Sequence, residues 1–396
     1  MNRSQLSSSP KTNEPVLFGP LQALVGAGVV LALILLFQES QKQALLFGIG
    51  LGLGVALYYG AFGFTAAYRN AFVKRDVTGV ITQIIMIGLA TLLFAPILAK
   101  GSVFGHGVGG AWAPLGWQVG IGAFIFGIGM QLGGACASGT LFSVGGGSLR
   151  MLVTLIFFCL GAFWGSLHLG WWGQLGDVGA QSLGHLWGWD YGVAAQMGLL
   201  LLIVYGLKKW SRNHVQTQLW NRNIGLKNLW LGPWPFLLSA IVLAALNFAT
   251  LLVAGHPWSI TWAFTLWGAK AVSLLGWNSL TSGFWSAPFQ SNALSASIIA
   301  DNTSLMNIAL LCGAFGAAFL SRQFEFKTSM TLKTLIAAVI GGLMMGYGAR
   351  LAYGCNIGAF FSGIASTSLH GWLWIICALS GTWIGIRLRP FFDLGT

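Results

Sequence analysis

Charge is the scarcest property of this chain. Only 7% of its 396 residues are Asp, Glu, Lys or Arg, whereas 56% are hydrophobic and the mean hydropathy is +0.75. A soluble domain of this length cannot bury so much apolar surface. The composition therefore excludes an ordinary soluble protein and predicts an all-α polytopic membrane protein.

Acidic residues are rarer than basic ones, with eight Asp and Glu against 20 Lys and Arg. The basic residues form no stripe of the kind that binds nucleic acid. Instead they gather between apolar stretches, at Arg69–Arg75, Lys208–Lys227 and Arg322–Lys333. Lys and Arg are enriched in cytoplasmic loops, and Trp171–Asp190, which has neither, is expected outside. Both termini are then expected in the cytoplasm.

Cysteine and histidine are too few and too scattered for a metal centre. There are five Cys and six His, with no CxxC pair and no His at ligand spacing. All five cysteines fall inside apolar stretches, which argues against a secreted disulfide framework. We expect neither a metal nor another cofactor. Packing explains Cys159, Cys312 and Cys377, each of which precedes a glycine in a plain apolar segment.

Eleven apolar stretches are candidates for membrane spans. They cover residues 16–37, 45–67, 79–99, 117–147, 151–168, 192–207, 233–254, 259–280, 303–320, 333–349 and 371–388. A helix needs roughly 20 apolar residues to cross a bilayer. The first stretch lacks a small-residue cleavage site, so we interpret it as a retained helix rather than a signal peptide. The region between Ser259 and Ala300 is predicted to form a broken or re-entrant pair rather than one clean crossing, because it contains Trp285, Pro288 and the polar residues near 290–297.

A cysteine-bearing segment occurs twice, at Gly127–Gly139 and Gly346–Gly358. At an offset of 219 residues the identical pairs are Gly127/Gly346, Gly129/Gly348, Leu132/Leu351, Cys136/Cys355 and Gly139/Gly358. At an offset of 220, Gly161 and Gly165 correspond to Gly381 and Gly385. With the basic loops inside, the first copy runs inward and the second outward. The pattern predicts two inverted repeats with broken or re-entrant glycine-rich helices.

The repeat also predicts how the chain is divided. We expect a polar cytoplasmic N-terminus at 1–15 and a first transmembrane half at 16–207. A basic cytoplasmic linker at 208–230 then leads to the second half at 231–396.

Each repeated cysteine follows glycines that favour a break in a helix. A helix that begins after such a break has free N–H donors and a positive dipole end, which attract an anion without a buried Lys or Arg. A neutral thiol is a soft, weak donor that suits a polarizable sulfur atom. The candidate substrate-path residues are Gly134, Cys136, Ser138, Gly354, Cys355 and Asn356. The simpler alternative is that both cysteines only pack between close helices.

Three charged residues lie in or beside apolar stretches. Lys270 and Asp301 are candidates for a functional role, with an interfacial position as the alternative. Arg350 falls inside the second repeat, where Gln131 occupies the matching place in the first. A symmetric charged site is therefore excluded.

At these motifs the sequence resembles the YeeE/YedE family of bacterial inner-membrane proteins, whose characterised members take up thiosulfate. The resemblance rests on GIGMQLGGACASG at 127–139, on GYGARLAYGCNIGAFFSGIASTSLHGW at 346–372 and on LYYGAFGFTAAYRNAFVKRD at 57–76. It covers most of the chain and implies a multi-pass inner-membrane location.

The resemblance implies that Cys136 and Cys355 line a central path and pass thiosulfate along by thiol contacts. The family pattern has a third functional cysteine directly before a Phe-Thr-Ala segment. In this chain Gly63 stands at that position, followed by Phe64 and Thr65. Three consequences of this difference stay open: Thr65 or backbone groups serve this part of the route, the substrate differs, or transport is slower.

The function predicted from the residues and the resemblance is a permease, not an enzyme, that imports thiosulfate or a related sulfur-containing anion. The resemblance also implies a small cytoplasmic sulfur-carrier protein as a partner. One alternative is a membrane thiol sulfurtransferase that carries a persulfide on one cysteine. Another is a transporter of a selenium compound, and a third is a structural subunit whose repeat serves only tight helix packing.

Overall fold

The computed structural model describes residues 40–211, 219–220 and 225–395. The predicted N-terminal segment (1–15) and first span (16–37) lie outside these residues, as does part of the predicted linker. Among the described residues, nine helical stretches are long and apolar enough to cross a membrane. The prediction of an all-α polytopic membrane protein is confirmed at this level.

Each predicted span from 45–67 onward, except 259–280, is occupied by one helix or by two consecutive helices. These helices are α2 (Gln41–Gly60), α3 (Phe64–Lys74), α4 (Thr78–Lys100), α5 (Trp117–Gly133), α6 (Ala137–Gly145), α7 (Leu149–Leu167), α10 (Trp189–Ser211), α12 (Phe236–Ala254), α15 (Asn302–Leu320), α16 (Leu332–Leu351) and α18 (Leu369–Leu388). The other helical elements are α8 (Leu169–Gly173), α9 (Leu183–Trp187), α11 (Leu226–Leu231), α13 (Thr261–Ser273), η2 (Ser279–Thr281), α14 (Pro288–Ser295), η3 (Ile298–Ala300), η4 (Asn356–Ser362), α17 (Gly363–Ala365) and η5 (Arg389–Phe392).

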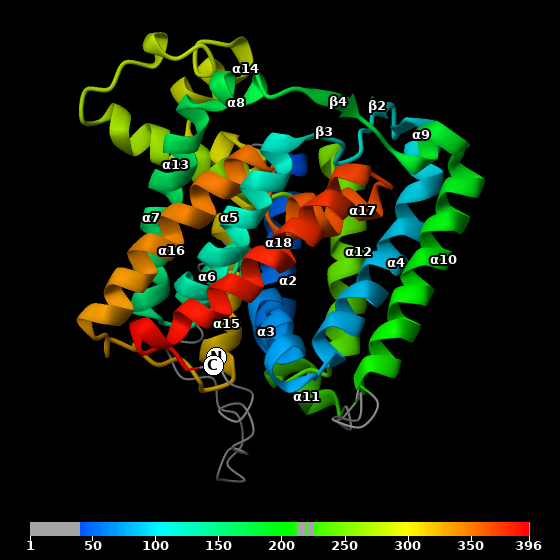
Figure 1. The fold of residues 1–396 in the computed structure, drawn as a ribbon, viewed down its shortest axis with the longest axis horizontal. Coiled ribbons are helices and arrows are strands. Elements are labelled where there is room, and N and C mark those ends of the chain that lie inside the picture. The colour runs from blue at the N-terminus through cyan, green and yellow to red at the C-terminus, as the bar shows by residue number, and fades with distance from the viewer. Residues whose placement is uncertain (1–39, 212–218, 221–224, 396) are drawn as a thin grey trace.

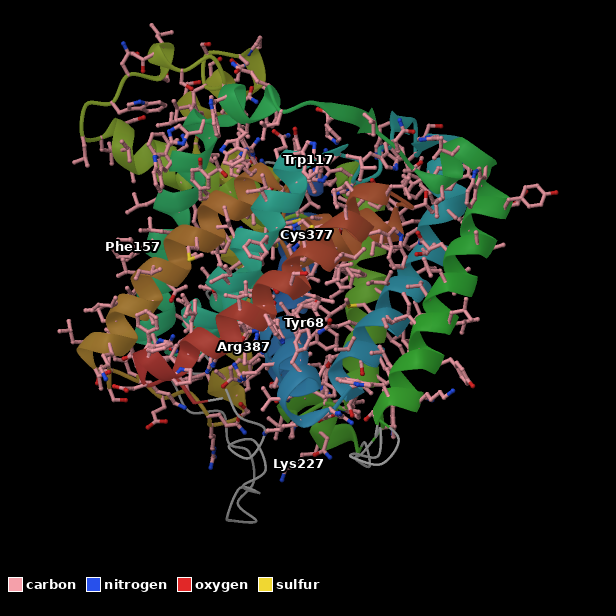
Figure 2. The ribbon with its side chains drawn as sticks, in the orientation of Figure 1. Tyr68, Trp117, Phe157, Lys227, Cys377 and Arg387 are labelled. Carbon is pink, nitrogen blue, oxygen red and sulfur yellow. The ribbon has the colours of Figure 1, made fainter. Side chains whose placement is uncertain are left out.

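The two ends of the helical bundle differ in character. Two small antiparallel pairs, β1 (Ser102–Val103) with β2 (His106–Gly107) and β3 (Pro114–Gly116) with β4 (Asp177–Ala180), lie at the same end as α8 and α14 (Figure 1). The C-terminus and α11 lie at the other end (Figure 1). Trp117 marks the first end, and Lys227 and Arg387 the second (Figure 2). We call the end that holds α11 and the C-terminus the basic end, and the other the opposite end.

The predicted span at 259–280 is shorter in the structure. Helix α13 ends at Ser273, and Gly276 then adopts a left-handed φ of +92°. Thirteen residues of helix extend about 20 Å, less than the roughly 30 Å hydrocarbon core of a bilayer. The short elements η2, α14 and η3 follow at the opposite end before α15 begins.

Glycines allow two pairs of helices to pack at backbone distance. A side chain at Gly127 of α5 would meet Ala378 and Thr382 of α18, and one at Gly381 of α18 would meet Phe124 and Ile128 of α5. The helices α16 and α7 also pack closely through glycines. There, Gly346 packs against Phe158 and Ala162, and Gly161 packs against Leu343. Small residues at such crossings give the close van der Waals contact on which helix association in membranes depends.

Candidate functional site

Two helices stop abruptly just before the repeated cysteines. Helix α5 ends at Gly133, and Gly134 turns the chain with a left-handed φ of +96°. Helix α16 ends at Leu351, and Gly354 follows with a φ of +158°. Glycine adopts both conformations at low cost because it has no Cβ. A new helical segment begins directly after each cysteine, so each cysteine is the N-cap of a short helix.

The side chains of Cys136 and Cys355 are buried, and they lie close enough to each other to interact electrostatically. Each is 1% exposed. The Cys136 Sγ lies 3.4 Å from the Ser138 hydroxyl, and the backbone N–H groups of Phe64 and Gly139 lie near the same sulfur. The Cys355 Sγ accepts a long hydrogen bond of 3.5 Å from the Ile357 N–H. Both sulfurs therefore sit among the free donors of a helix N-terminus.

A third helix start completes this centre. Helix α3 begins after Gly63, and its first turn contains Thr65, which is 2% exposed. The Thr65 hydroxyl has no hydrogen-bond partner among the described residues, whereas its backbone carbonyl accepts a 3.2 Å bond from Gln131 of α5. Phe64 also packs edge-on against Phe360 of η4. The starts of α3, α6 and η4 thus converge around the two thiols.

A cavity of about 320 Å³ reaches Cys136 from the basic end. We call it the thiol cavity. Among the residues that line it are Gly63, Thr65, Gly134, Arg150 and Lys327. Its mouth is formed by the α6–α7 turn and the segment after α15, which are joined by the backbone bridge between Ser148 and Lys327. An anion next to Cys136 would therefore have an exit toward this end that passes the cations Arg150 and Lys327.

The structure brings all seven predicted path residues into one region, but they divide into two groups. Gly134, Cys136 and Thr65 line the thiol cavity, and the Ser138 hydroxyl lies 3.4 Å from the Cys136 sulfur. The other three, Gly354, Cys355 and Asn356, are not among the residues that line this cavity. Asn356 is fully buried and donates a 3.2 Å hydrogen bond to the Tyr68 hydroxyl of α3.

Sequence reasoning missed the residues that hold the end of α5. The Arg150 guanidinium donates a 2.7 Å bond to the Leu132 carbonyl, and the Arg389 guanidinium donates a 2.6 Å bond to the Gln131 carbonyl. These carbonyls belong to the last turn of α5 and lack partners within the helix. Cations are favoured there by the helix dipole. The signal available in the sequence was the presence of two arginines at the borders of apolar stretches.

The intramembrane candidates Lys270 and Asp301 have structural contacts. The Lys270 Nζ donates 2.6 Å bonds to the carbonyls of Leu294 and Ala296, at the end of α14. The Asp301 carboxylate caps α15 by accepting a 2.7 Å bond from the Ser304 N–H. Arg350 packs its guanidinium 4.6 Å from the ring centre of Phe284. None of the three lines the thiol cavity.

Together these features define a multi-pass membrane protein in which interrupted helices bring two buried thiols close together, with a cavity that reaches one of them, Cys136. The family model described as Sulphur transport matches residues 59–384, and the chain belongs to this family. The probable transporter YedE of Escherichia coli (strain K12) is 33% identical over 174 residues, and this alignment spans only 42% of each chain.

Longer alignments join the chain to two other relatives. The thiosulfate transporter TsuA of Spirochaeta thermophila is 26% identical over 357 residues, which cover 85% of this chain and 95% of the relative. The thiosulfate transporter TsuA of Escherichia coli (strain K12) is 24% identical over 357 residues, covering 85% and 93%. The chain is thus similar to these transporters over 85% of its length.

Proposed function

We propose that this protein is an inner-membrane permease that imports thiosulfate or a related sulfur-containing anion. The observation that carries the proposal is the pair Cys136 and Cys355, each 1% exposed and each at the start of a short helix. Helix N-termini attract the negative charge of such an anion, and the thiols offer soft contacts to its terminal sulfur. The likeness to relatives named thiosulfate transporters supports this substrate.

In the proposed route the anion enters from the opposite end, contacts Cys355, and then passes to Cys136 and the thiol cavity. The thiols act as stepping contacts and form no covalent bond with the anion. The thiol cavity leads to the basic end, which we assign to the cytoplasm because Lys and Arg accumulate there. Both termini and the linker at 208–230 are then cytoplasmic.

The two halves, 16–207 and 231–396, are proposed to be inverted repeats. The glycine contacts support this assignment. Gly161 packs on Leu343 as Gly381 packs on Phe124, and positions 124 and 343 are separated by the same offset as the two cysteines. Gly165 meets Tyr347 and Arg350, whereas Gly385 meets Ile128 and Gln131, again at this offset. The symmetry would bring the two broken helices together at the substrate path.

The alternative function, a membrane thiol sulfurtransferase, has less support. A nucleophilic cysteine needs a nearby cation or base to favour its thiolate. Among the described residues, no Lys, Arg or His hydrogen-bonds either sulfur, and the donors near Cys136 are a hydroxyl and backbone N–H groups. We therefore propose transport without an enzymatic step. A selenium compound in place of thiosulfate and a sulfur-carrier partner both stay predictions.

The test is uptake of radiolabelled thiosulfate by cells that lack their own sulfur-anion transporters. The unmodified chain is compared with Cys136→Ala and Cys355→Ala at matched expression. Cys312→Ala, a thiol in α15 that lies outside the thiol cavity, is the control. We expect uptake that is lost in the first two variants and kept in the third. Equal uptake in all variants would rule out the thiol path, and no uptake by the unmodified chain would redirect the search to selenium compounds.

A further inference from the structure

A second cavity lies at the basic end beside the thiol cavity. It has a volume of about 360 Å³, and the charged residues that line it are Arg69, Lys74, Asp76 and Arg389. Its cations therefore outnumber its single carboxylate by three to one. We call it the arginine cavity.

The two cavities share one thin wall. Ala61, Gly63 and Ala66 line both of them. Gly63 carries no side chain, and a Cβ at this position would find its nearest neighbours 3.8 and 4.0 Å away. The wall between Cys136 and the arginine cavity therefore has no side chain at Gly63, the residue directly before α3.

The cations around this wall are poorly neutralised. The Arg389 guanidinium lies close enough to those of Arg69 and Arg150 to be repelled by both. Among the described residues, none of these three forms an ion pair with a carboxylate. The Asp76 Oδ1 accepts a 3.0 Å bond from the Thr78 N–H, so this carboxylate caps α4. Holding like charges together without a counter-ion is costly, and an anionic ligand would remove that cost.

The three arginines also differ in what their guanidinium groups do. Arg150 and Arg389 donate to the carbonyls at the end of α5, which holds them in place. No side-chain hydrogen bond of Arg69 is found within the described part of the chain, and its side chain lines the arginine cavity. Its donors are therefore available to a ligand, and guanidinium groups bind oxyanions through strong, paired hydrogen bonds.

We propose that the arginine cavity is a second anion subsite, which receives small divalent oxyanions as they leave Cys136 for the cytoplasm. The inference rests on the proposed function for its direction of travel. Thiosulfate has one soft sulfur and three hard oxygens. The thiols serve the sulfur end, and Arg69 binds the oxygen end. Sulfate, which has only oxygens, binds at the arginine cavity but not at the thiols.

The subsite can be tested without measuring transport. Gly63→Cys, made in a Cys136→Ala background, places a reporter thiol in the shared wall of the purified full-length chain. The probe is a methanethiosulfonate reagent that carries a sulfonate. Its reaction rate is measured with increasing sulfate, at constant ionic strength adjusted with chloride. Sulfate is used because thiosulfate itself attacks the reagent, and the same background with Gly63 intact supplies the blank.

We expect sulfate to slow the labelling, with chloride having little effect. Arg69→Gln should raise the sulfate concentration for half-protection about tenfold, as expected for the loss of one charge-assisted hydrogen bond. Arg69→Lys should restore part of the protection. The control is Lys208→Gln, which removes one positive charge from an exposed site on α10 that lines neither cavity.

Two results would overturn the subsite: labelling that sulfate does not slow, or protection that is equal in Arg69→Gln and Lys208→Gln. Either result leaves the thiol path intact if uptake still depends on Cys136. Conversely, Arg69-dependent protection in a chain that takes up no thiosulfate would support the anion subsite while the proposed substrate fails. Elution of each variant as a single species on size exclusion shows that the comparison concerns folded protein.

Discussion

The Asn356 side-chain amide donates a 3.2 Å hydrogen bond to the Tyr68 hydroxyl, across 288 positions of the chain. Tyr68 lies on α3, and Asn356 is the first residue of η4, directly after Cys355. Both side chains are buried, at 2% and 0% exposure. The bond therefore ties one helix start of the thiol centre to another, at a place where water cannot replace a lost partner.

Removing the Tyr68–Asn356 hydrogen bond should destabilise the packing of α3 against η4 around the two thiols. We expect Tyr68→Phe to lower the stability of the purified protein by about 1–2 kcal/mol, because it leaves the buried Asn356 amide without this partner. Thermal unfolding in detergent measures the change, and thiosulfate uptake should fall with it. Tyr205→Phe, at an exposed tyrosine of α10, is the matched control and should change neither quantity. Unchanged unfolding in Tyr68→Phe would mean that the bond contributes nothing.

Adding a thiol at the start of α3 should help transport. Gly63 has a φ of −106°, which any residue adopts, and a new Cβ would meet only ordinary contacts. We expect Gly63→Cys to raise the rate of thiosulfate uptake, because it restores a soft contact in the wall beside Cys136. Gly63→Ala separates the effect of the sulfur from that of side-chain volume. A rate that is equal in the two variants would assign the effect to volume alone.

Serine substitutions should distinguish hydrogen bonding from sulfur contact. Cys136→Ser and Cys355→Ser keep a hydroxyl donor of similar size but remove the soft sulfur atom. We expect each variant to retain partial uptake, below that of the unmodified chain and above that of the alanine variant. The measurement is initial uptake over a range of thiosulfate concentrations. Complete loss in the serine variants would show that sulfur itself is indispensable.

Glycines at the helix crossings should not tolerate a methyl group. A Cβ at Gly381 of α18 would collide with the Phe124 carbonyl of α5, so we expect Gly381→Ala to destabilise the protein by about 1–3 kcal/mol. Gly316→Ala in α15 is the matched control, since a Cβ there has no neighbour within 4 Å. It should be neutral or slightly stabilising, because alanine favours helix. Thermal unfolding of both variants checks the contrast, which equal melting temperatures would contradict.

Local patterns predicted a large part of this architecture. Long apolar stretches predicted the spans because a bilayer imposes the same length requirement on every helix that crosses it. Glycines before Cys136 and Cys355 predicted the helix breaks because glycine alone reaches left-handed conformations cheaply. The segment at 259–280 was predicted too long, since hydropathy does not register the turn at Gly276 that follows α13.

The sequence by itself determined that this protein lies in a membrane and where most of its helices run. It also determined the two helix breaks, which precede Cys136 and Cys355. These properties depend on residues that are close together in the chain. Only the tertiary structure decided what surrounds the thiols. The Tyr68–Asn356 bond and the hold of Arg389 on the Gln131 carbonyl join positions 288 and 258 residues apart. Such contacts leave no local pattern, because their energy is gained only after the helices have packed.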